Sequence, residues 1–547
     1  MTAPVGGANA ARRMTVGEGI VEALLAQGVD TVFGIPGAHM YDFNDALARV
    51  GDRIRFVTAR HEQGAAWMAY GYAQATGRPG VFTVVPGPGV LNAGAALCTA
   101  YGANAPVLCI TGNIMSHLIG RGRGQLHELP DQLATLKGIV KHAARITHPT
   151  GVSAAMEEAF AQMLSGRPGP VAIEAPWDVF GMSGMVAPCR VVERETPALD
   201  PTAIAAAAEM VARARSPMIM IGGGAMEAGE EVLALARRID APVLSHRSGK
   251  GIVDGDDPRA LNLISGYEAW KECDLLIGIG SRLELQHMRW SWRPEGLKVL
   301  RIDIDPTEFV RLRPDLGVLA DAAEGAAALA AACPQAIDRS ARFAPIKARA
   351  AIAAATVQPQ ASHLAAIRAA LPKDGVLVEE VCQTGFTARF AFPSHAKRTY
   401  ISSGYQETLG FGYGTALGVK AGRPDVAVVS LVGDGGFMFA VQEMATAAQY
   451  GLGVVAVLFD NGSFGNVRRD QMQKYDGRLI GADLANPDFV ALALAFGIAA
   501  QRIERVDALE SAVREALATD APALIVVPVA RGSETPPWPF LHPAPHA

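Results

Sequence analysis

A short apolar run that ends in a glycine-rich acidic turn is the feature that most restricts how this chain can fold. Val426–Val432 is rich in β-branched residues and reads as a buried strand, and the turn Gly433–Gly436 follows it directly. Phe437–Tyr450 then carries apolar residues at helical spacing, and Val454–Phe459 predicts a second strand. A strand–helix–strand unit of this length is a right-handed crossover, so the sequence predicts two neighbouring parallel strands.

Two side chains with hard oxygen atoms stand at the ends of these strands. Asp434 and Asn461 are 27 positions apart and are expected at the carboxyl edge of the sheet, where open α/β sheets bind ligands. A carboxylate and an amide oxygen suit Mg²⁺ or Ca²⁺. The glycines around Asp434 would let the backbone approach a diphosphate, and the helix that starts near Phe437 would point its N–H groups at it. Taken alone, the motif fits an ordinary strand-end turn with a solvated Asp434 equally well.

The length of the chain predicts several domains. At 547 residues it is too long for one hydrophobic core. Short apolar strands alternate with helical stretches in three segments, which we delimit as residues 12–188, 200–335 and 360–530. Val191–Thr202 and Ala344–Gln360 are expected to be linkers. This pattern predicts an α/β fold with three doubly wound parallel-sheet domains.

Composition and charge exclude several classes of protein. The formal charge of −5 gives no electrostatic reason to expect nucleic acid, and no apolar run approaches the length of a membrane span. The six cysteines have no Cys-x-x-Cys spacing and read as thiols of a reducing compartment. No apolar core follows Arg12-Arg13, so we expect no signal peptide. These features predict a cytoplasmic enzyme with no nucleic-acid or membrane partner.

The motif around Asp434 and several longer motifs elsewhere in the chain resemble those of one enzyme family. The Gly433-Asp-Gly turn followed by Asn461 resembles the thiamine diphosphate signature, with Asp460 in place of the first of its two asparagines. Further stretches resemble acetolactate synthase and its relatives over nearly the whole chain: Phe33–His39, Arg60–Ala66, Pro86–Asn92, Gly166–Pro170, Arg301–Pro306 and Thr408–Gly412. The chain is therefore identified as a member of the superfamily of acetolactate synthase, benzaldehyde lyase and benzoylformate decarboxylase. Its three domains would be the pyrimidine-binding, central and diphosphate-binding domains of that superfamily.

The resemblance implies thiamine diphosphate and Mg²⁺ as cofactors. The metal ligands would be the side chains of Asp434 and Asn461 and the backbone carbonyl of Ser463. Leu409 would wedge the cofactor into a bent form, and the backbone carbonyl of Glu407 would grip its pyrimidine ring. The cofactor-binding positions that the resemblance implies are Gln383, Thr384, Glu407, Leu409, Gly433, Gly435, Gly436, Asn461, Ser463 and Phe464.

Glu62 is the residue on which the implied chemistry depends. It opens a predicted helix after the strand Ile54–Thr58, where an acidic side chain also complements the helix dipole. In the family, the matching glutamate hydrogen-bonds the aminopyrimidine ring and favours the imino form that removes the C2 proton of the cofactor. The cofactor then serves as the electron sink when a carbon–carbon bond breaks. We expect Glu62 to be partly buried, so that it shares a proton with the ring near neutral pH.

Two histidines are candidates for moving a substrate proton. Gly37-Ala-His39 and Leu126–Gln132 resemble benzaldehyde lyase, in which the first histidine lies beside the reacting carbon. His39 and His127 are therefore candidate proton shuttles, because imidazole titrates near neutral pH. A capping or surface role is the alternative for each of them. The chain also departs from acetolactate synthase at Asp470, which stands where those enzymes carry a tryptophan.

We predict a carbon–carbon lyase or carboligase, and so a lyase or transferase, that is similar to acetolactate synthase. It would act on 2-oxo acids or 2-hydroxy ketones through a cofactor-bound enamine. The alternatives are a non-carboligating 2-oxo acid decarboxylase of the benzoylformate decarboxylase type and a flavin-linked oxidoreductase. The flavin-holding motif of acetolactate synthases is replaced around Leu263–Gly266, so we predict that FAD is dispensable, although the family's central domain holds FAD, ADP or nothing. In this family the active sites are shared between chains, which implies a homodimer or homotetramer.

Overall fold

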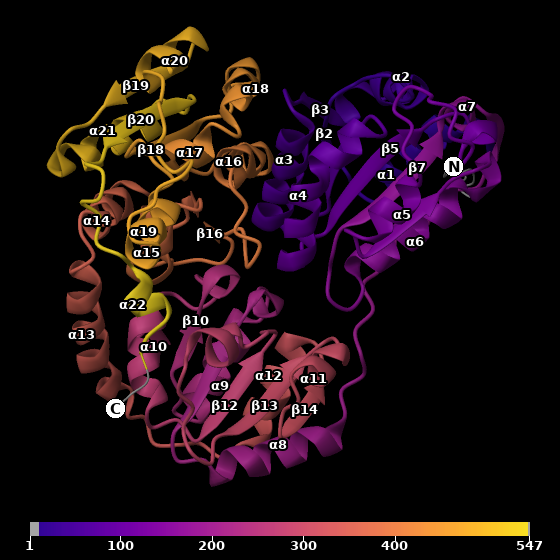
Figure 1. Cartoon of the computed structure of the whole chain (residues 1–547). Coiled ribbons are helices and arrows are strands. Elements are labelled where there is room, and N and C mark those ends of the chain that lie inside the picture. Colours follow the sequence, from indigo (N-terminus) through magenta and orange to yellow (C-terminus); the bar gives the residue numbers. More distant parts are fainter. Residues whose placement is uncertain (1–9, 545–547) are drawn as a thin grey trace, which may run out of the picture. The chain divides into compact units, whose positions relative to one another are not determined.

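The protein is built on three six-stranded parallel sheets, which confirms the predicted fold class (Figure 1). The structure is a computed structural model that describes residues 10–544. A separate antiparallel ribbon pairs β1 (Arg12–Thr15) with β8 (Ser183–Val186). No helix within residues 10–544 is long and apolar enough to cross a membrane. All six cysteines are free thiols.

The N-terminal sheet has the order β3-β2-β4-β5-β7-β6. Its strands are β2 (Thr31–Gly34), β3 (Arg55–Thr58), β4 (Gly80–Val84), β5 (Val107–Asn113), β6 (His142–Arg145) and β7 (Val171–Pro176). Its helices are α1 (Val16–Ala26), α2 (Tyr41–Arg49), α3 (Glu62–Thr76), α4 (Pro88–Ala103), α5 (Gln132–Lys137), α6 (Val152–Leu164) and α7 (Trp177–Phe180). Because β3 and β4 flank β2 on opposite sides and parallel crossovers are right-handed, the connecting helices cover both faces of the sheet.

The central sheet has the order β11-β10-β9-β12-β13-β14 and reverses between β9 and β12. Its strands are β9 (Pro217–Ile221), β10 (Val243–Ser245), β11 (Ala260–Leu261), β12 (Leu275–Ile279), β13 (Lys298–Asp303) and β14 (Leu316–Leu319). Its helices are α8 (Pro201–Arg213), α9 (Gly229–Arg238), α10 (Leu263–Trp270), α11 (Thr307–Arg311) and α12 (Ala322–Ala332).

The C-terminal sheet has the order β16-β15-β17-β18-β20-β19 and reverses between β15 and β17. Its strands are β15 (Val376–Val378), β16 (Tyr400–Ile401), β17 (Val428–Gly433), β18 (Val454–Asp460), β19 (Ala499–Arg502) and β20 (Ala523–Pro528). The helices of this part are α13 (Phe343–Ala355), α14 (Gln360–Ala370), α15 (Gln383–Ala391), α16 (Phe411–Gly422), α17 (Asp434–Phe437), α18 (Met444–Tyr450), α19 (Gly465–Lys474), α20 (Phe489–Ala495), α21 (Leu509–Ala518) and α22 (Trp538–Leu541). The central strand β17 is buried along its whole length, as expected for a parallel sheet covered on both faces.

The chain divides into two compact units that do not follow the sequence strictly. One unit holds the residues up to Glu195 together with Gly414–Pro424 and Ala440–Leu452, and the other holds the rest. Most of α16 thus packs within the first unit, where Gly71 approaches the backbone carbonyl of Thr415 closely. The boundaries of the three predicted sequence domains remain a prediction.

Two details of the predicted secondary structure were wrong. The continuous helix Phe437–Tyr450 is in fact two short helices, α17 and α18. Gly435 and Gly436 lie inside α17, and the interruption falls at residues 438–443, where the segment passes from one compact unit to the other. The expected linker Ala344–Gln360 is mostly the helix α13, which its alanine-rich composition favours and whose Phe343 and Ala354 are buried.

Candidate active site

The polar residues predicted in the C-terminal domain gather at the reversal point of its sheet. Ligands of open α/β sheets bind outside the carboxyl ends of the strands at such a point. Gln383 and Thr384 follow β15 at the start of α15, and Asp434 follows β17 directly. Asn461 and Ser463 follow β18, the next strand in the sheet. The structure therefore brings these five residues to one edge of one sheet.

Asp434 lies in a concentration of negative charge. It is buried, and its Oδ2 accepts a 2.7 Å hydrogen bond from Nδ2 of Asn486. The same nitrogen donates to Oδ1 of Asp460 at 2.8 Å, so one neutral amide bridges two carboxylates. Burial, reinforced by the charge of Asp460, raises the pKa of Asp434. A divalent cation bound to Asp434 would balance this negative charge. Carboxylate oxygens are the hard ligands that Mg²⁺ prefers.

Asn461 is held between two neighbours. Its Oδ1 accepts hydrogen bonds from the backbone N–H of Ser463 at 3.0 Å and from the Ser463 hydroxyl at 2.9 Å. Its Nδ2 donates to Oε2 of Glu534 at 2.9 Å. Glu534 belongs to the C-terminal segment that leads into α22, and burial raises the pKa of its carboxyl. Two of the predicted metal ligands, Asn461 and Ser463, are therefore direct neighbours.

The glycines after β17 are required by close packing. A Cβ atom on Gly435 would lie 2.5 Å from Cε1 of Phe464, and a Cβ atom on Gly436 would lie 3.2 Å from Cδ of Glu380. Both neighbours belong to loops that carry other predicted residues. The glycine-rich turn thus packs the two loops together, a role that spacing alone did not reveal.

The start of α15 presents two buried oxygen atoms that have no partner among the described residues. They are Oε1 of Gln383 and Oγ1 of Thr384. The thiol of Cys382 caps the helix, because its Sγ accepts the N–H of Gly385 at 3.3 Å. Unpaired buried polar atoms are rare in native proteins, and a helix N-terminus favours an anion. After rotation of its amide group, Gln383 can donate to such an anion together with the Thr384 hydroxyl.

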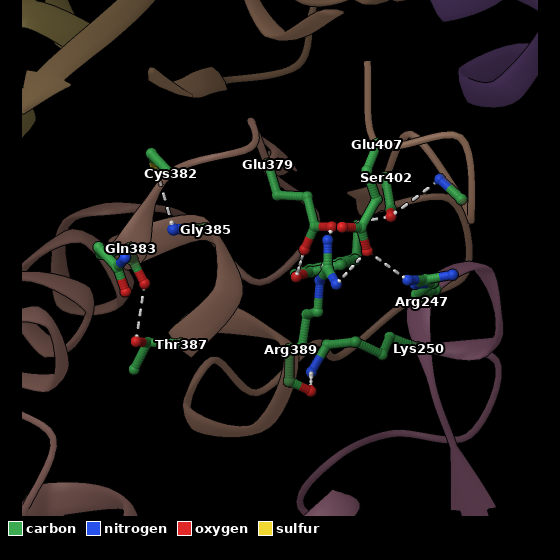
Figure 2. Close-up of polar contacts among 12 residues, drawn as sticks. Arg247, Lys250, Glu379, Cys382, Gln383, Gly385, Thr387, Arg389, Ser402 and Glu407 are labelled. Atoms are coloured by element: carbon green, nitrogen blue, oxygen red, sulfur yellow. Dashed lines mark hydrogen bonds and ion pairs between the residues drawn. The ribbon is translucent and has the colours of Figure 1, made fainter. Parts of the chain in front are cut away.

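The side chain of Glu407 belongs to a chain of ion pairs (Figure 2). Its Oε1 accepts hydrogen bonds from Nη2 of Arg247 at 2.7 Å and from Nη1 of Arg389 at 2.8 Å. Burial alone would raise the pKa of Glu407, but Arg389 and Arg247 outweigh it and lower that pKa. Arg389 in turn donates to Oε1 of Glu379 at 3.1 Å. Ion pairs with Arg247 and Arg389 thus hold the loop that carries Glu407 and the half-buried Leu409.

The predicted residues of the N-terminal domain also follow strands near a reversal point. His39 lies in the turn after β2, and Glu62 begins α3 after β3. The turn after β4 lies against two of the predicted catalytic residues, His127 and Glu62. A Cβ atom on Gly87 would lie 2.5 Å from the backbone carbonyl oxygen of His127, and a Cβ atom on Gly89 would lie 3.6 Å from Cγ of Glu62.

Glu62 is partly buried, as the sequence predicted. It lies at the first position of α3, and His61 caps this helix by accepting the N–H of Gln63 on its Nδ1 at 3.1 Å. Oε2 of Glu62 accepts a hydrogen bond from Nδ2 of Asn92 at 2.9 Å. The carboxylate is thus oriented by a neighbour and still partly accessible.

Glu443 is a buried carboxylate that the sequence analysis missed. Its Oε1 accepts the backbone N–H groups of Arg60 at 3.1 Å and of His61 at 3.0 Å. Burial raises the pKa of Glu443 to about 6. A Cβ atom on Gly64 would overlap this carboxylate, so the glycine is needed. Its only sequence signal was an acidic residue in a predicted helix, a pattern that is usually a solvated face.

The two candidate histidines lie side by side in the N-terminal domain. The rings of His39 and His127 are 5.4 Å apart, and the ring of Trp177 meets His39 edge to face at 4.8 Å. Nε2 of His39 lies 3.0 Å from the carbonyl oxygen of Leu126, while Nδ1 of both histidines is buried and has no partner among the described residues. Burial, helped by the charge of His127, lowers the pKa of His39. Both residues have positive φ, 69° for His39 and 65° for His127, a backbone region that non-glycine residues seldom occupy.

Family comparisons agree with this arrangement. Three family models match in chain order: "Thiamine pyrophosphate enzyme, N-terminal TPP binding domain" at residues 14–135, "central domain" at residues 204–329 and "C-terminal TPP binding domain" at residues 380–527. The chain belongs to the thiamine pyrophosphate-dependent enzymes. Thiamine pyrophosphate is the compound called thiamine diphosphate above, so the family resemblance is confirmed.

Relatives within this thiamine diphosphate-dependent family are named for different activities. A probable 2-ketoarginine decarboxylase of Pseudomonas aeruginosa is 36% identical over 529 residues, which cover 94% of each chain. A probable acetolactate synthase large subunit of Methanocaldococcus jannaschii is 33% identical over 93% of this chain and 90% of its own. The large subunit of acetolactate synthase isozyme 2 of Escherichia coli is also 33% identical, over 96% of this chain and 97% of its own. The family is therefore shown, while the choice between decarboxylation and carboligation is not.

Proposed function

We propose that this thiamine diphosphate-dependent enzyme also requires Mg²⁺ and breaks or forms the carbon–carbon bond beside a carbonyl group of 2-oxo acids or 2-hydroxy ketones. The observation that carries the proposal is the pair of buried oxygens on Gln383 and Thr384 that have no hydrogen-bond partner within residues 10–544. They begin α15 at the same sheet edge as Asp434, so a diphosphate with its metal would satisfy both the orphaned atoms and the local negative charge. When bound, thiamine diphosphate supplies the electron sink for the bond that breaks.

The residues of the chain would divide the work between the two ends of the cofactor. Asp434, the Asn461 side chain and the Ser463 carbonyl would hold Mg²⁺, and Gln383 and Thr384 would bind the diphosphate. The apolar Leu409 side chain and the Glu407 carbonyl would orient the pyrimidine.

Proton transfer would fall to the N-terminal domain. The partly buried Glu62 would share a proton with the pyrimidine ring, and Asn92 would hold its carboxylate in place. His39, kept neutral at pH 7 by burial, would accept or return the hydroxyl proton of the substrate, with His127 beside it.

A decarboxylase that releases an aldehyde without ligation is the second candidate function. The relative named as a probable 2-ketoarginine decarboxylase favours it. Both functions begin with the same 2-oxo acid chemistry and differ in whether a second carbonyl compound is accepted before release.

Product analysis separates these functions. The purified protein, supplied with thiamine diphosphate and Mg²⁺, would be given pyruvate, 2-ketoarginine and aromatic 2-oxo acids, with and without an added aldehyde. We expect CO₂ together with a 2-hydroxy ketone when the aldehyde is present. Release of CO₂ and aldehyde alone would favour the decarboxylase. Absence of turnover on all of these 2-oxo acids, and on 2-hydroxy ketones supplied in their place, would overturn the proposal.

We also propose that the active form is a homodimer or homotetramer whose sites are completed between chains. This proposal rests on the family resemblance. Sedimentation analysis across a range of protein concentrations tests it, because dilution should lower activity in step with dissociation. A fully active monomer would contradict it.

A further inference from the structure

Three strained residues converge on the ion pairs around Glu407. Arg247, Leu283 and Glu407 have φ values of 47°, 54° and 47°, although none of them is glycine. Arg247 follows β10 and Leu283 follows β12, so both stand at the carboxyl edge of the central sheet. Glu407 lies in the loop between β16 and α16. Side-chain-bearing residues remain in this region of backbone space only where their surroundings hold them, and such residues cluster at functional sites.

The contacts that hold Arg247 and Glu407 are ionic, and their members range from buried to partly buried. Arg247, whose side chain is 6% exposed, donates from Nη1 to Oε2 of Glu284 at 2.9 Å and from Nη2 to Glu407. Arg289 donates from Nε to Oε1 of Glu284 at 3.1 Å. Three cations and three anions thus alternate in one network: Arg247, Arg289, Arg389, Glu284, Glu379 and Glu407. Because the charges balance, the network is suited to holding loops in place rather than to attracting a charged substrate.

The network also reaches the helix that would bind the diphosphate. Arg389 lies near the end of α15, the helix that begins with Gln383 and Thr384, and it clamps the same Oε1 atom of Glu407 as Arg247 does (Figure 2). One carboxylate oxygen is therefore fixed from two directions. One arginine comes from the central domain and the other from the candidate diphosphate helix.

We infer that Arg247 is a positioning residue for the cofactor. Through the carboxylate of Glu407, it holds the left-handed backbone that presents the Glu407 carbonyl, and the adjoining Leu409, to the pyrimidine. The inference rests on the proposed function, which assigns that carbonyl and Leu409 to the cofactor. The central domain supplies none of the predicted cofactor contacts. Through Arg247 it would nevertheless set the geometry of the loop that carries Glu407 and Leu409.

The test measures cofactor affinity apart from catalysis. Titration calorimetry with thiamine diphosphate and Mg²⁺ would compare the wild type with Arg247→Met, Arg247→Lys, Glu407→Gln and the Arg247→Met/Glu407→Gln double variant. We expect Arg247→Met and Glu407→Gln each to weaken binding about tenfold or more, and Arg247→Lys to recover part of the loss. The double variant should bind the cofactor with about the affinity of whichever single variant binds it less tightly, because both changes break the same contact.

Asp240→Asn is a matched control within the central domain. Asp240 also has positive φ, at 54°, and its buried carboxylate is held by Arg259, Arg339 and Arg342. It lies between α9 and β10, at the amino edge of the sheet rather than the carboxyl edge. Asp240→Asn should therefore lower the unfolding temperature without changing cofactor affinity.

The outcomes separate this inference from the proposed function. If the wild type does not bind thiamine diphosphate, the proposed function itself is overturned. Normal binding by the wild type, Arg247→Met and Glu407→Gln alike would overturn only the positioning role, as would strictly additive losses in the double variant. If Arg247→Met does not fold, Glu407→Gln, which preserves side-chain volume, decides the question by the same titration.

Discussion

The buried carboxylate of Glu443 accepts a 3.0 Å hydrogen bond from the backbone N–H of His61, the residue that caps the helix begun by Glu62. It accepts the N–H of Arg60 as well, so the turn before Glu62 is anchored on a single acidic side chain. Because the candidate catalytic residue follows this turn directly, its position depends on a residue that does not contact the cofactor in the proposed mechanism.

We predict that Gly64→Ala will impair activity through Glu443. The added Cβ would overlap the Glu443 carboxylate and displace it, and a shift of about 1 Å at a reacting group can cost about 10²-fold in rate. Steady-state kinetics and thermal unfolding would be measured together. Gly94→Ala, inside α4, is the control: a Cβ there meets only Cδ1 of Ile139, at 4.0 Å, so the kinetics should be unchanged and the unfolding temperature should not fall. Equal kinetics for both variants would refute the anchoring role.

Glu62→Gln should separate binding from proton transfer. The amide can still hydrogen-bond the pyrimidine ring but cannot share a proton with it, so cofactor affinity should be nearly normal. Exchange of the cofactor's C2 proton with deuterium, followed by NMR, should slow by about 10²–10⁴-fold. Glu22→Gln, at an exposed ion pair with Arg12, serves as the control. Unchanged exchange in Glu62→Gln would assign the proton transfer to another group.

Asp434→Ala should abolish binding of both Mg²⁺ and thiamine diphosphate. The fold should survive, because removing this carboxylate relieves its repulsion with Asp460. Calorimetric titration and apoprotein unfolding are the measurements, and exhaustive chelation of the wild type should remove activity that added Mg²⁺ restores. Asp488→Ala, which removes the cap of α20 and costs about 1 kcal/mol of stability, should bind both cofactors normally. Full activity after metal removal would exclude the assigned role.

His39→Gln should remove an acid limb from the pH dependence of turnover. Burial lowers the pKa of His39 below its ordinary value of about 6.5, so the imidazole is neutral at pH 7 and accepts protons. Wild-type turnover should therefore fall only when the pH drops below this ordinary value of about 6.5 and His39 becomes protonated. At pH 7, loss of this acid–base group should cost about 10²–10⁴ in turnover with little change in cofactor affinity. Replacing the exposed His117 by Gln is the control; identical profiles would leave His39 with a purely structural role.

FAD should be dispensable. The prediction rests on the replacement of the flavin-holding motif of acetolactate synthases around Leu263–Gly266. The measurement is the visible absorbance of the purified protein, followed by activity after any flavin has been stripped. A stoichiometric flavin whose removal abolishes turnover would return the assignment to a flavin-containing acetolactate synthase.

Local sequence signals were sufficient for the elements that carry the candidate site. The apolar run before Gly433 became β17, and Glu62 opens α3 after β3 as its context predicted. The alanine-rich composition of Ala322–Ala332 likewise favours the helix α12 that this stretch forms. These features depend on periodicity and composition over a few residues, which a single sequence displays directly.

Only the tertiary structure decided which side chains hold the site in place. Glu443 meets His61 across 382 positions of sequence, and Arg247 meets Glu407 across 160. A charged residue in a helix or loop looks the same in sequence whether it is solvated or buried, because the partners that compensate its burial come from distant segments. The sequence by itself therefore determined the family, the sheets and the candidate cofactor ligands. The folded chain determined how buried charge orients them, since that depends on long-range packing with no local signature.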